Sequence, residues 1–202
     1  MRITGGILKG RVLKVPPGPL RPTQDKVRAA LFSMLGESVV GARVLDLFAG
    51  SGALGLEAWS RGAAYVCWVE SDPRVLKVLR ASVADLCGPG GGATECRRDD
   101  ALRFLQKTGA GGPFDLVLAD PPYDPARRAG RWLEKTLLAL ETGPILAPEG
   151  LLVFEQAARQ PIPESPGWNL LRDRTYGETR LLIFRRAAGA SGEDREIPPS
   201  VP

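Results

Sequence analysis

Short apolar runs alternate with longer amphipathic stretches along most of this chain. The runs have the length and apolar content of buried parallel strands, and they lie at 43–48, 65–70, 93–97, 114–119 and 151–155. The stretches between them are predicted helices, at 53–59, 73–86, 100–107 and 127–141. This regular alternation predicts an α/β fold built on an open, mostly parallel sheet.

Both ends of the chain depart from that alternation. Residues 2–13 are predicted to form a hairpin of two short strands, too polar and brief to enter the main core. A proline-rich connection leads to a predicted helix that begins at a capping Thr23 and ends at Leu35. Residues 168–174 and 179–186 are predicted to form a terminal hairpin. The predicted organisation is an N-terminal hairpin and linker at 1–22, one α/β domain at 23–186, and a disordered tail at 187–202.

The segment after the first strand has the residues of a nucleotide-binding turn. Gly50, Gly52 and Gly55 match the spacing G-x-G-x-x-G. Glycines at these positions let a ligand approach the backbone N–H groups where a helix starts. Glu70 ends the next strand, where an acid can bind ribose hydroxyls. On these residues alone, the ligand is a nicotinamide dinucleotide or S-adenosylmethionine (AdoMet).

A second motif closes the fourth predicted strand. Asp120-Pro121-Pro122-Tyr123 directly follows the apolar run 114–119. The fourth strand is expected beside the first, so Asp120 would face the glycine loop. A carboxylate that accepts a hydrogen bond from a planar exocyclic amine raises the electron density on nitrogen and can take the departing proton. The Pro121 carbonyl would accept the second N–H and Tyr123 would stack on a flat base, so the motif favours methyl transfer to an amino nitrogen over hydride transfer.

The charge of the 202-residue chain is +4, and it is concentrated at one end. Residues 1–35 carry a net charge of +6 and the remainder −2, which predicts a polyanionic partner near the N-terminus. The chain has no histidine, so histidine-based catalysis is excluded and a metal site is not expected. The three cysteines form no C-x-x-C pair, and no apolar run approaches the ~18 residues of a membrane span. We expect a reduced, cytoplasmic protein.

These motifs together resemble those of a known family. The matching segments are 2–6 with 9–11, 20–28, 45–58, 120–123 and the turn at 176–177. Over about residues 2 to 186 the chain is similar to the RsmD type of bacterial 16S rRNA guanine-N2 methyltransferase, within the class I AdoMet-dependent enzymes. The resemblance implies a Rossmann-like sheet of seven strands, the last antiparallel. The N-terminal hairpin is expected to be a small appendage to this sheet.

The resemblance also implies roles for individual residues. Those that would hold AdoMet are Asp46, Phe48, Ala49, Gly50, Ser51, Gly52, Glu70, Ser71, Asp72, Asp100 and Ala101. Because Asp99 precedes Asp100, either acid could face the adenine. The catalytic residues would be Asp120, Pro121, Pro122 and Tyr123. The residues expected to contact the substrate RNA are Arg2, Lys9, Arg11, Arg21 and Thr23.

The predicted function is methyl transfer from AdoMet to the exocyclic N2 of one guanine in the 16S rRNA of the small ribosomal subunit, by a monomer. The same chemistry permits two other acceptors, adenine N6 in DNA and a protein glutamine. A DNA enzyme usually carries a target-recognition domain, for which this chain has no residues to spare. The glutamine enzymes usually have Asn in place of Asp120. An alternative from a different class is a non-catalytic RNA-binding assembly factor that retains the cofactor fold.

Overall fold

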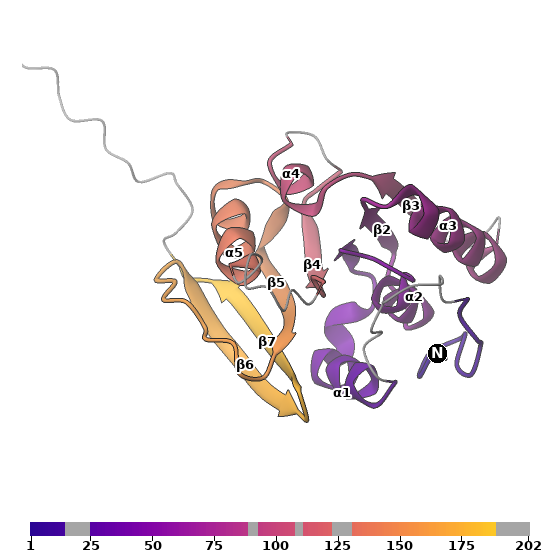
Figure 1. Ribbon diagram of the computed structural model, residues 1–202, viewed down its shortest axis with the longest axis horizontal. Coiled ribbons are helices and arrows are strands. Elements are labelled where there is room, and N and C mark those ends of the chain that lie inside the picture. Colours follow the sequence, from indigo (N-terminus) through magenta and orange to yellow (C-terminus); the bar gives the residue numbers. More distant parts are fainter. Residues whose placement is uncertain (15–24, 89–92, 108–110, 123–130, 189–202) are drawn as a thin grey trace, which may run out of the picture.

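The computed structural model describes residues 1–14, 25–88, 93–107, 111–122 and 131–188. A seven-stranded sheet in the order β3-β2-β1-β4-β5-β7-β6 forms its centre (Figure 1). The strands are β1 (Arg43–Leu47), β2 (Tyr65–Glu70), β3 (Ala93–Arg98), β4 (Phe114–Ala119), β5 (Leu146–Ala157), β6 (Trp168–Tyr176) and β7 (Thr179–Arg186). The helices are α1 (Asp25–Leu35), the 3-10 helix η1 (Gly36–Val39), α2 (Ala53–Ser60), α3 (Pro73–Cys87), α4 (Ala101–Leu105) and α5 (Trp132–Thr142).

Among the described strands, β7 alone runs opposite to all the others. Strands β1 to β5 pair in parallel, whereas β7 is antiparallel to both β5 and β6. The prediction of a seven-stranded sheet with an antiparallel last strand is therefore confirmed. Strand β4 lies beside β1, as the sequence also predicted, and the structure places Ala119 opposite Leu47. The carboxyl ends of β1, β2 and β4 consequently meet at one edge of the sheet.

Helices cover both faces of the sheet and create two hydrophobic cores. On one face, Leu31 of α1 and Leu54 of α2 pack in the same core as Val44 of β1, together with α3. On the other face, Phe104 of α4 packs in the same core as Leu45 of β1, together with α5. Successive residues of a strand point to opposite faces, so a central strand covered on both sides requires a nearly continuous apolar run.

The predicted limits agree best where the apolar pattern is strong. Strands β2, β4 and β7 have the predicted bounds. Strand β5 is longer than predicted, because Pro148 and Gly150 resemble a turn in the sequence. The residues from Leu146 nevertheless pair with β4, across a register shift that follows Phe114. The predicted cap Thr23, residues 127–130 and the tail from 189 onward lie outside the described residues.

The predicted N-terminal β-hairpin is wrong. Residues 1–14 form one isolated antiparallel bridge, between Arg2 and Val12, and the chain between them is a series of turns. The prediction that this segment is too polar for the core is also wrong, since Ile3, Leu8 and Leu13 are buried in the core shared with α1, α2 and α3. These apolar residues are spaced five apart rather than two, so a pair of regular strands could not bury all of them on one face.

Candidate active site

The glycine loop turns from β1 into α2 with backbone angles that suit glycine. Gly50 and Gly52 have φ angles of 53° and 79°, in the left-handed region. A Cβ atom on Gly52 would lie 2.2 Å from Leu79 Cδ1, and a Cβ atom on Gly55 would lie 2.2 Å from Trp68 Nε1. Gly50 and Gly52 therefore shape the turn, whereas Gly55 allows α2 to pack closely on β2.

Phe48, at the start of this loop, joins it to α5. Its φ angle is 58°, which is uncommon for a residue with a side chain. The Phe48 ring packs edge-on against Trp132, the first residue of α5, with ring centroids 5.1 Å apart and an interplanar angle of 73°. Trp132 is not among the residues predicted from the sequence. Its contact depends on β4 lying beside β1, so no local pattern indicates it.

Asp46 is buried beneath the glycine loop. Its side-chain Oδ2 accepts a hydrogen bond of 2.8 Å from the Gly55 N–H. Burial raises the pKa of the Asp46 carboxyl well above its ordinary value; the Gly55 hydrogen bond opposes that rise, and the charges of Asp120 and Glu70 add to it. A positively charged ligand beside Asp46 would offset both the burial and the repulsion between these acids.

Glu70, the last residue of β2, holds the glycine loop from the neighbouring strand. Its Oε2 accepts a hydrogen bond of 2.9 Å from the Gly50 N–H, and its Oε1 accepts one of 2.8 Å from the Asp72 N–H. The Ser71 hydroxyl donates a longer bond of 3.5 Å to the same Oε1. Both carboxylate oxygens thus fix the backbone around the site, and the side chain is half-buried.

The remaining predicted cofactor residues surround this loop. Ala49, Ser51 and Ala101 are buried. Asp72 caps α3 by accepting a hydrogen bond of 2.8 Å from the Arg74 N–H, and the two side chains form an exposed ion pair. The sequence did not indicate this double contact of Asp72.

The acids at the end of β3 have different partners. Asp100 caps α4 by accepting a hydrogen bond of 2.9 Å from the Arg103 N–H. Asp99 forms an ion pair with Lys107. Of the two acids, Asp99 is half-buried and Asp100 is exposed. The contact of Asp100, or of Asp99 in its place, with the adenine stays a prediction.

Asp120 directly follows β4 and lies beside the glycine loop. Because Ala119 is opposite Leu47, Asp120 and Phe48 are the next positions on adjacent parallel strands, which are about 4.8 Å apart. Asp120 and Pro121 are half-buried and Pro122 is exposed, whereas Tyr123 lies outside the described residues.

Carboxylates from three strands therefore converge at one edge of the sheet. Asp46, Glu70 and Asp120 come from the ends of β1, β2 and β4, and the charges of the last two act on Asp46. Within the described part of the chain, no group of three or more His, Cys, Asp or Glu side chains is arranged to hold a metal ion. These acids together suit a ligand that carries both a positive charge and hydroxyl groups.

Burial keeps the cysteine thiols protonated, which makes them poor nucleophiles. It raises the pKa of Cys67 and of Cys87 to about 12 and that of Cys96 to about 11. All three are free.

None of the described helices is long and hydrophobic enough to traverse a bilayer.

A family model described as "Conserved hypothetical protein 95" matches residues 1–185. The chain belongs to this family. Ribosomal RNA small subunit methyltransferase D of Escherichia coli (strain K12) is 40% identical to it over 197 residues, which are 96% of this chain and 94% of that protein. This match confirms the resemblance that the motifs predicted.

The chain also matches solved structures. The structure of yhhF from Escherichia coli matches with a TM-score of 0.80 and 39% identity, covering 93% of this chain and 98% of that chain. The structure of SMU.776, complexed with SAH, matches with a TM-score of 0.61 and 16% identity, covering 80% of this chain and 48% of that chain. At that identity the second match shows the fold alone.

In this member of the family, the N-terminal motif docks on the last turns of α2. The Thr4 N–H and hydroxyl donate hydrogen bonds of 2.8 and 2.6 Å to the Glu57 carboxylate. The Ser60 hydroxyl donates a bond of 2.6 Å to the Gly5 carbonyl. Gly6 has a φ angle of 71°, and a Cβ atom there would lie 1.8 Å from the Ser60 carbonyl oxygen. The glycines of the motif are thus explained by close passage over α2.

A second family motif reaches the same carboxylate. Arg28 and Glu57 are both fully buried and form an ion pair of 3.2 Å. Arg28 also pairs with Asp25 at 2.9 Å, and Arg61 pairs with Glu57 at 2.8 Å. The available signals were an arginine next to Val27 on an apolar helix face and an acid within an apolar helix.

The basic residues predicted to contact RNA are not brought next to Asp120. Arg2, Lys9 and Arg11 are exposed, and Arg11 pairs with Asp85 of α3 at 3.7 Å. Their segment is bonded to the last turn of α2, an 8-residue helix, so it lies about 12 Å along that helix from the glycine loop. The other two predicted RNA contacts, Arg21 and Thr23, lie outside the described residues.

Proposed function

We propose that this chain is an AdoMet-dependent methyltransferase whose acceptor is the exocyclic N2 of a guanine in 16S ribosomal RNA. The observation that carries the proposal is the position of Asp120. It directly follows β4 beside the glycine loop, in a chain 40% identical over 96% of its length to a protein named ribosomal RNA small subunit methyltransferase D. An acid at this place can serve an amine acceptor directly.

The residues around the glycine loop fit AdoMet. This cofactor carries a sulfonium and an ammonium group against one carboxylate, so its net charge is positive. The buried Asp46 and the neighbouring Asp120 match that charge. Glu70 would accept hydrogen bonds from the ribose hydroxyls, while Gly50 and Gly52 leave the loop backbone open to the methionine part. When bound, AdoMet supplies the electrophilic methyl group.

Asp120 and Pro121 would orient the target amine. The Asp120 carboxylate accepts one N–H of the guanine amine, and the Pro121 carbonyl accepts the other. These two acceptors direct the nitrogen lone pair toward the methyl group and place a base for the proton that the amine loses. Stacking of the flipped guanine on Tyr123 remains a prediction.

The exposed basic residues of the N-terminal segment would contact RNA phosphates. Arg2, Lys9 and Arg11 supply positive charge without base specificity, so they would position the RNA rather than select the nucleotide. Arg21 and Thr23 are proposed to lie near the target base. We propose that the protein acts as a monomer in the cytoplasm.

The deciding experiment is transfer of labelled methyl from AdoMet to small ribosomal subunits that lack their own modification, followed by nucleoside analysis. Label in N2-methylguanosine is the expected result. Label in a different nucleoside, or only in DNA or protein, would reject the guanine assignment. No transfer to any of these substrates, despite AdoMet binding, would favour the non-catalytic assembly factor.

Two variants of Asp120 test the mechanism. Asp120→Ala removes both the acceptor and the base, so turnover should fall by about 100-fold or more. Asp120→Asn keeps the size of the side chain and one acceptor oxygen for the amine, but it removes the base. Comparison of the two variants therefore separates the positioning of the amine from the removal of its proton. AdoMet affinity, measured by calorimetry, should persist in both variants. A fully active Asp120→Ala protein would contradict the assigned role.

A further inference from the structure

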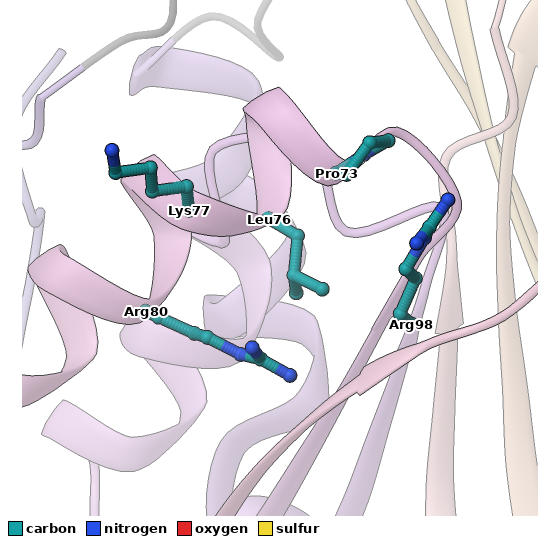
Figure 2. Close-up of a pocket in the computed structure, with 5 residues that line it drawn as sticks. All are labelled: Pro73, Leu76, Lys77, Arg80 and Arg98. Carbon is teal, nitrogen blue, oxygen red and sulfur yellow. The ribbon is translucent and has the colours of Figure 1, made fainter.

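A positively charged pocket lies between α3 and the edge strand β3, outside the candidate active site. Its volume is about 300 Å³, and its lining residues are Pro73, Leu76, Lys77, Arg80 and Arg98 (Figure 2). Pro73 and Leu76 form its apolar part, on the first turn of α3. The other three lining residues are cations, and no acid lines the pocket within the described part of the chain.

The fold brings these cations together from two elements. Lys77 and Arg80 are three positions apart on α3, so they lie on one side of the helix. Arg80 donates a hydrogen bond of 3.2 Å to the Cys96 carbonyl of β3, which holds its guanidinium against that strand. In Figure 2 the Arg80 side chain extends from α3 toward the strands. Arg98 reaches the pocket from the last position of β3. All three side chains are exposed, so a bound anion need not enter the core.

The pocket is close to the proposed cofactor site. Arg98 is opposite Glu70 in the pairing of β3 with β2, and Pro73 follows Ser71 and Asp72 at the same edge of the sheet. Strand β3 lies two strand spacings from β1, or about 10 Å. A ligand in the pocket would therefore lie beside the acids of the active site without occupying their place.

The same helix also contacts the basic N-terminal segment. Arg11 pairs with Asp85 in the last turns of α3, whereas the pocket is on its first turns. Between Pro73 and Asp85 the helix rises about 18 Å. Cationic side chains thus lie near both ends of α3, with Arg11 beside its last turns and the pocket residues near its first turns.

We propose that this pocket binds a backbone phosphate of the substrate RNA. The bound RNA would then extend from the N-terminal segment past the pocket to the active site. The inference rests on the proposed function, since it deepens the assignment of an RNA substrate. Guanidinium and ammonium groups bind phosphate oxygens through charge-assisted hydrogen bonds. AdoMet does not fit the pocket, because its net positive charge suits the acids around the glycine loop instead.

The test measures binding of protein-free 16S rRNA transcript by the Lys77→Gln/Arg98→Gln protein across a series of salt concentrations. Arg80 is left intact because it bonds to β3. Loss of two phosphate contacts should weaken binding by about tenfold or more near 0.1 M salt, and should reduce the slope of log K against log salt by up to about 2. The KM for small subunits should rise while kcat and AdoMet affinity stay unchanged.

Arg172→Gln/Arg174→Gln is the matched control, since it removes the same charge from exposed positions on β6, the opposite edge of the sheet. An equal loss of RNA affinity in this control would contradict the proposed phosphate site, because it would show that RNA binding falls with any loss of positive charge from the surface. An unchanged salt slope in the pocket variant would also overturn it. The slope is read from binding alone, so it tests the pocket even if the wild-type protein methylates another nucleoside.

Discussion

The Gly50 N–H donates a hydrogen bond of 2.9 Å to Glu70 Oε2, so the last residue of β2 holds the loop that follows β1. The other carboxylate oxygen of Glu70 accepts the Asp72 N–H at 2.8 Å. One side chain thus determines the relative position of two loops at the edge where the cofactor is proposed to bind. Glu70 has a structural task in addition to its predicted contact with ribose.

Replacing Glu70 with alanine should weaken AdoMet binding by about 10- to 100-fold, because hydrogen bonds to a charged group contribute about 1.5–3 kcal/mol. Calorimetric titration with AdoMet measures the change. Glu70→Gln keeps one acceptor oxygen for the Gly50 N–H and should lose less affinity. Thermal unfolding provides the folding control, and an unaltered AdoMet affinity in the alanine variant would contradict the assignment.

Replacing Asp46 with asparagine should stabilise the protein without ligand, in a manner that depends on pH. Burial raises the pKa of Asp46 in the folded state, so folding favours its protonated form. The ionised form therefore lowers the stability of the wild-type protein as pH rises above about 4, and Asp46→Asn avoids that loss. The advantage of the variant should be absent in acid and should grow with pH, as measured by urea unfolding at several pH values.

The same variant should bind AdoMet less tightly at neutral pH, because it lacks the negative charge that faces the proposed cation. Wild-type affinity should increase as pH rises and Asp46 ionises, whereas the affinity of Asp46→Asn should not follow that change. Parallel pH profiles for the two proteins would refute the coupling between Asp46 and the cofactor.

Breaking the buried pair between Arg28 and Glu57 should destabilise the protein strongly. Arg28→Met leaves the Glu57 charge buried with fewer partners, at a cost of about 3–5 kcal/mol in the free energy of unfolding. Glu57→Gln should cost a similar amount. The double variant should cost clearly less than the sum, since each single change already removes the pair. Simple additivity in urea unfolding would show that the two side chains are not coupled.

Comparison of Gly6→Ala with Gly10→Ala separates the free-energy cost of a steric clash with α2 from the cost of a left-handed backbone conformation. Both glycines have positive φ angles, 71° and 85°. A Cβ atom on Gly6 would lie 1.8 Å from the Ser60 carbonyl oxygen, whereas a Cβ atom on Gly10 meets nothing within 4 Å. Gly10→Ala should cost about 1–2 kcal/mol, and Gly6→Ala about 1–3 kcal/mol more.

Hydrogen exchange at Ile7 locates the effect of the Gly6 change. The Ile7 N–H donates a bond of 2.8 Å to the Ser60 carbonyl, so its exchange should accelerate in Gly6→Ala and much less in Gly10→Ala. Equal exchange rates in the two variants would mean that the N-terminal segment is not held by its contact with α2.

The sequence alone determined the elements whose signals are local. The apolar runs of β1, β2 and β4 predicted their limits to within a residue, because a strand covered on both faces needs apolar residues at consecutive positions. The spacing of Gly50, Gly52 and Gly55 predicted the turn between β1 and α2, and the rules of parallel sheets placed Asp120 next to it. These inferences use residues that are near in the chain or related by a regular topology.

Only the tertiary structure decided the contacts between residues distant in the chain. The N-terminal segment packs on α2 instead of forming a hairpin, because residues of α2 satisfy its polar groups. Glu57 accepts hydrogen bonds from the Thr4 N–H and hydroxyl, while Ser60 accepts one from the Leu8 N–H and donates one to the Gly5 carbonyl. The contact of Phe48 with Trp132 and the approach of Arg98 to α3 likewise depend on how helices and strands pack. Burial and hydrogen-bond satisfaction select such partners across the whole molecule, and no periodicity within one segment of sequence records them.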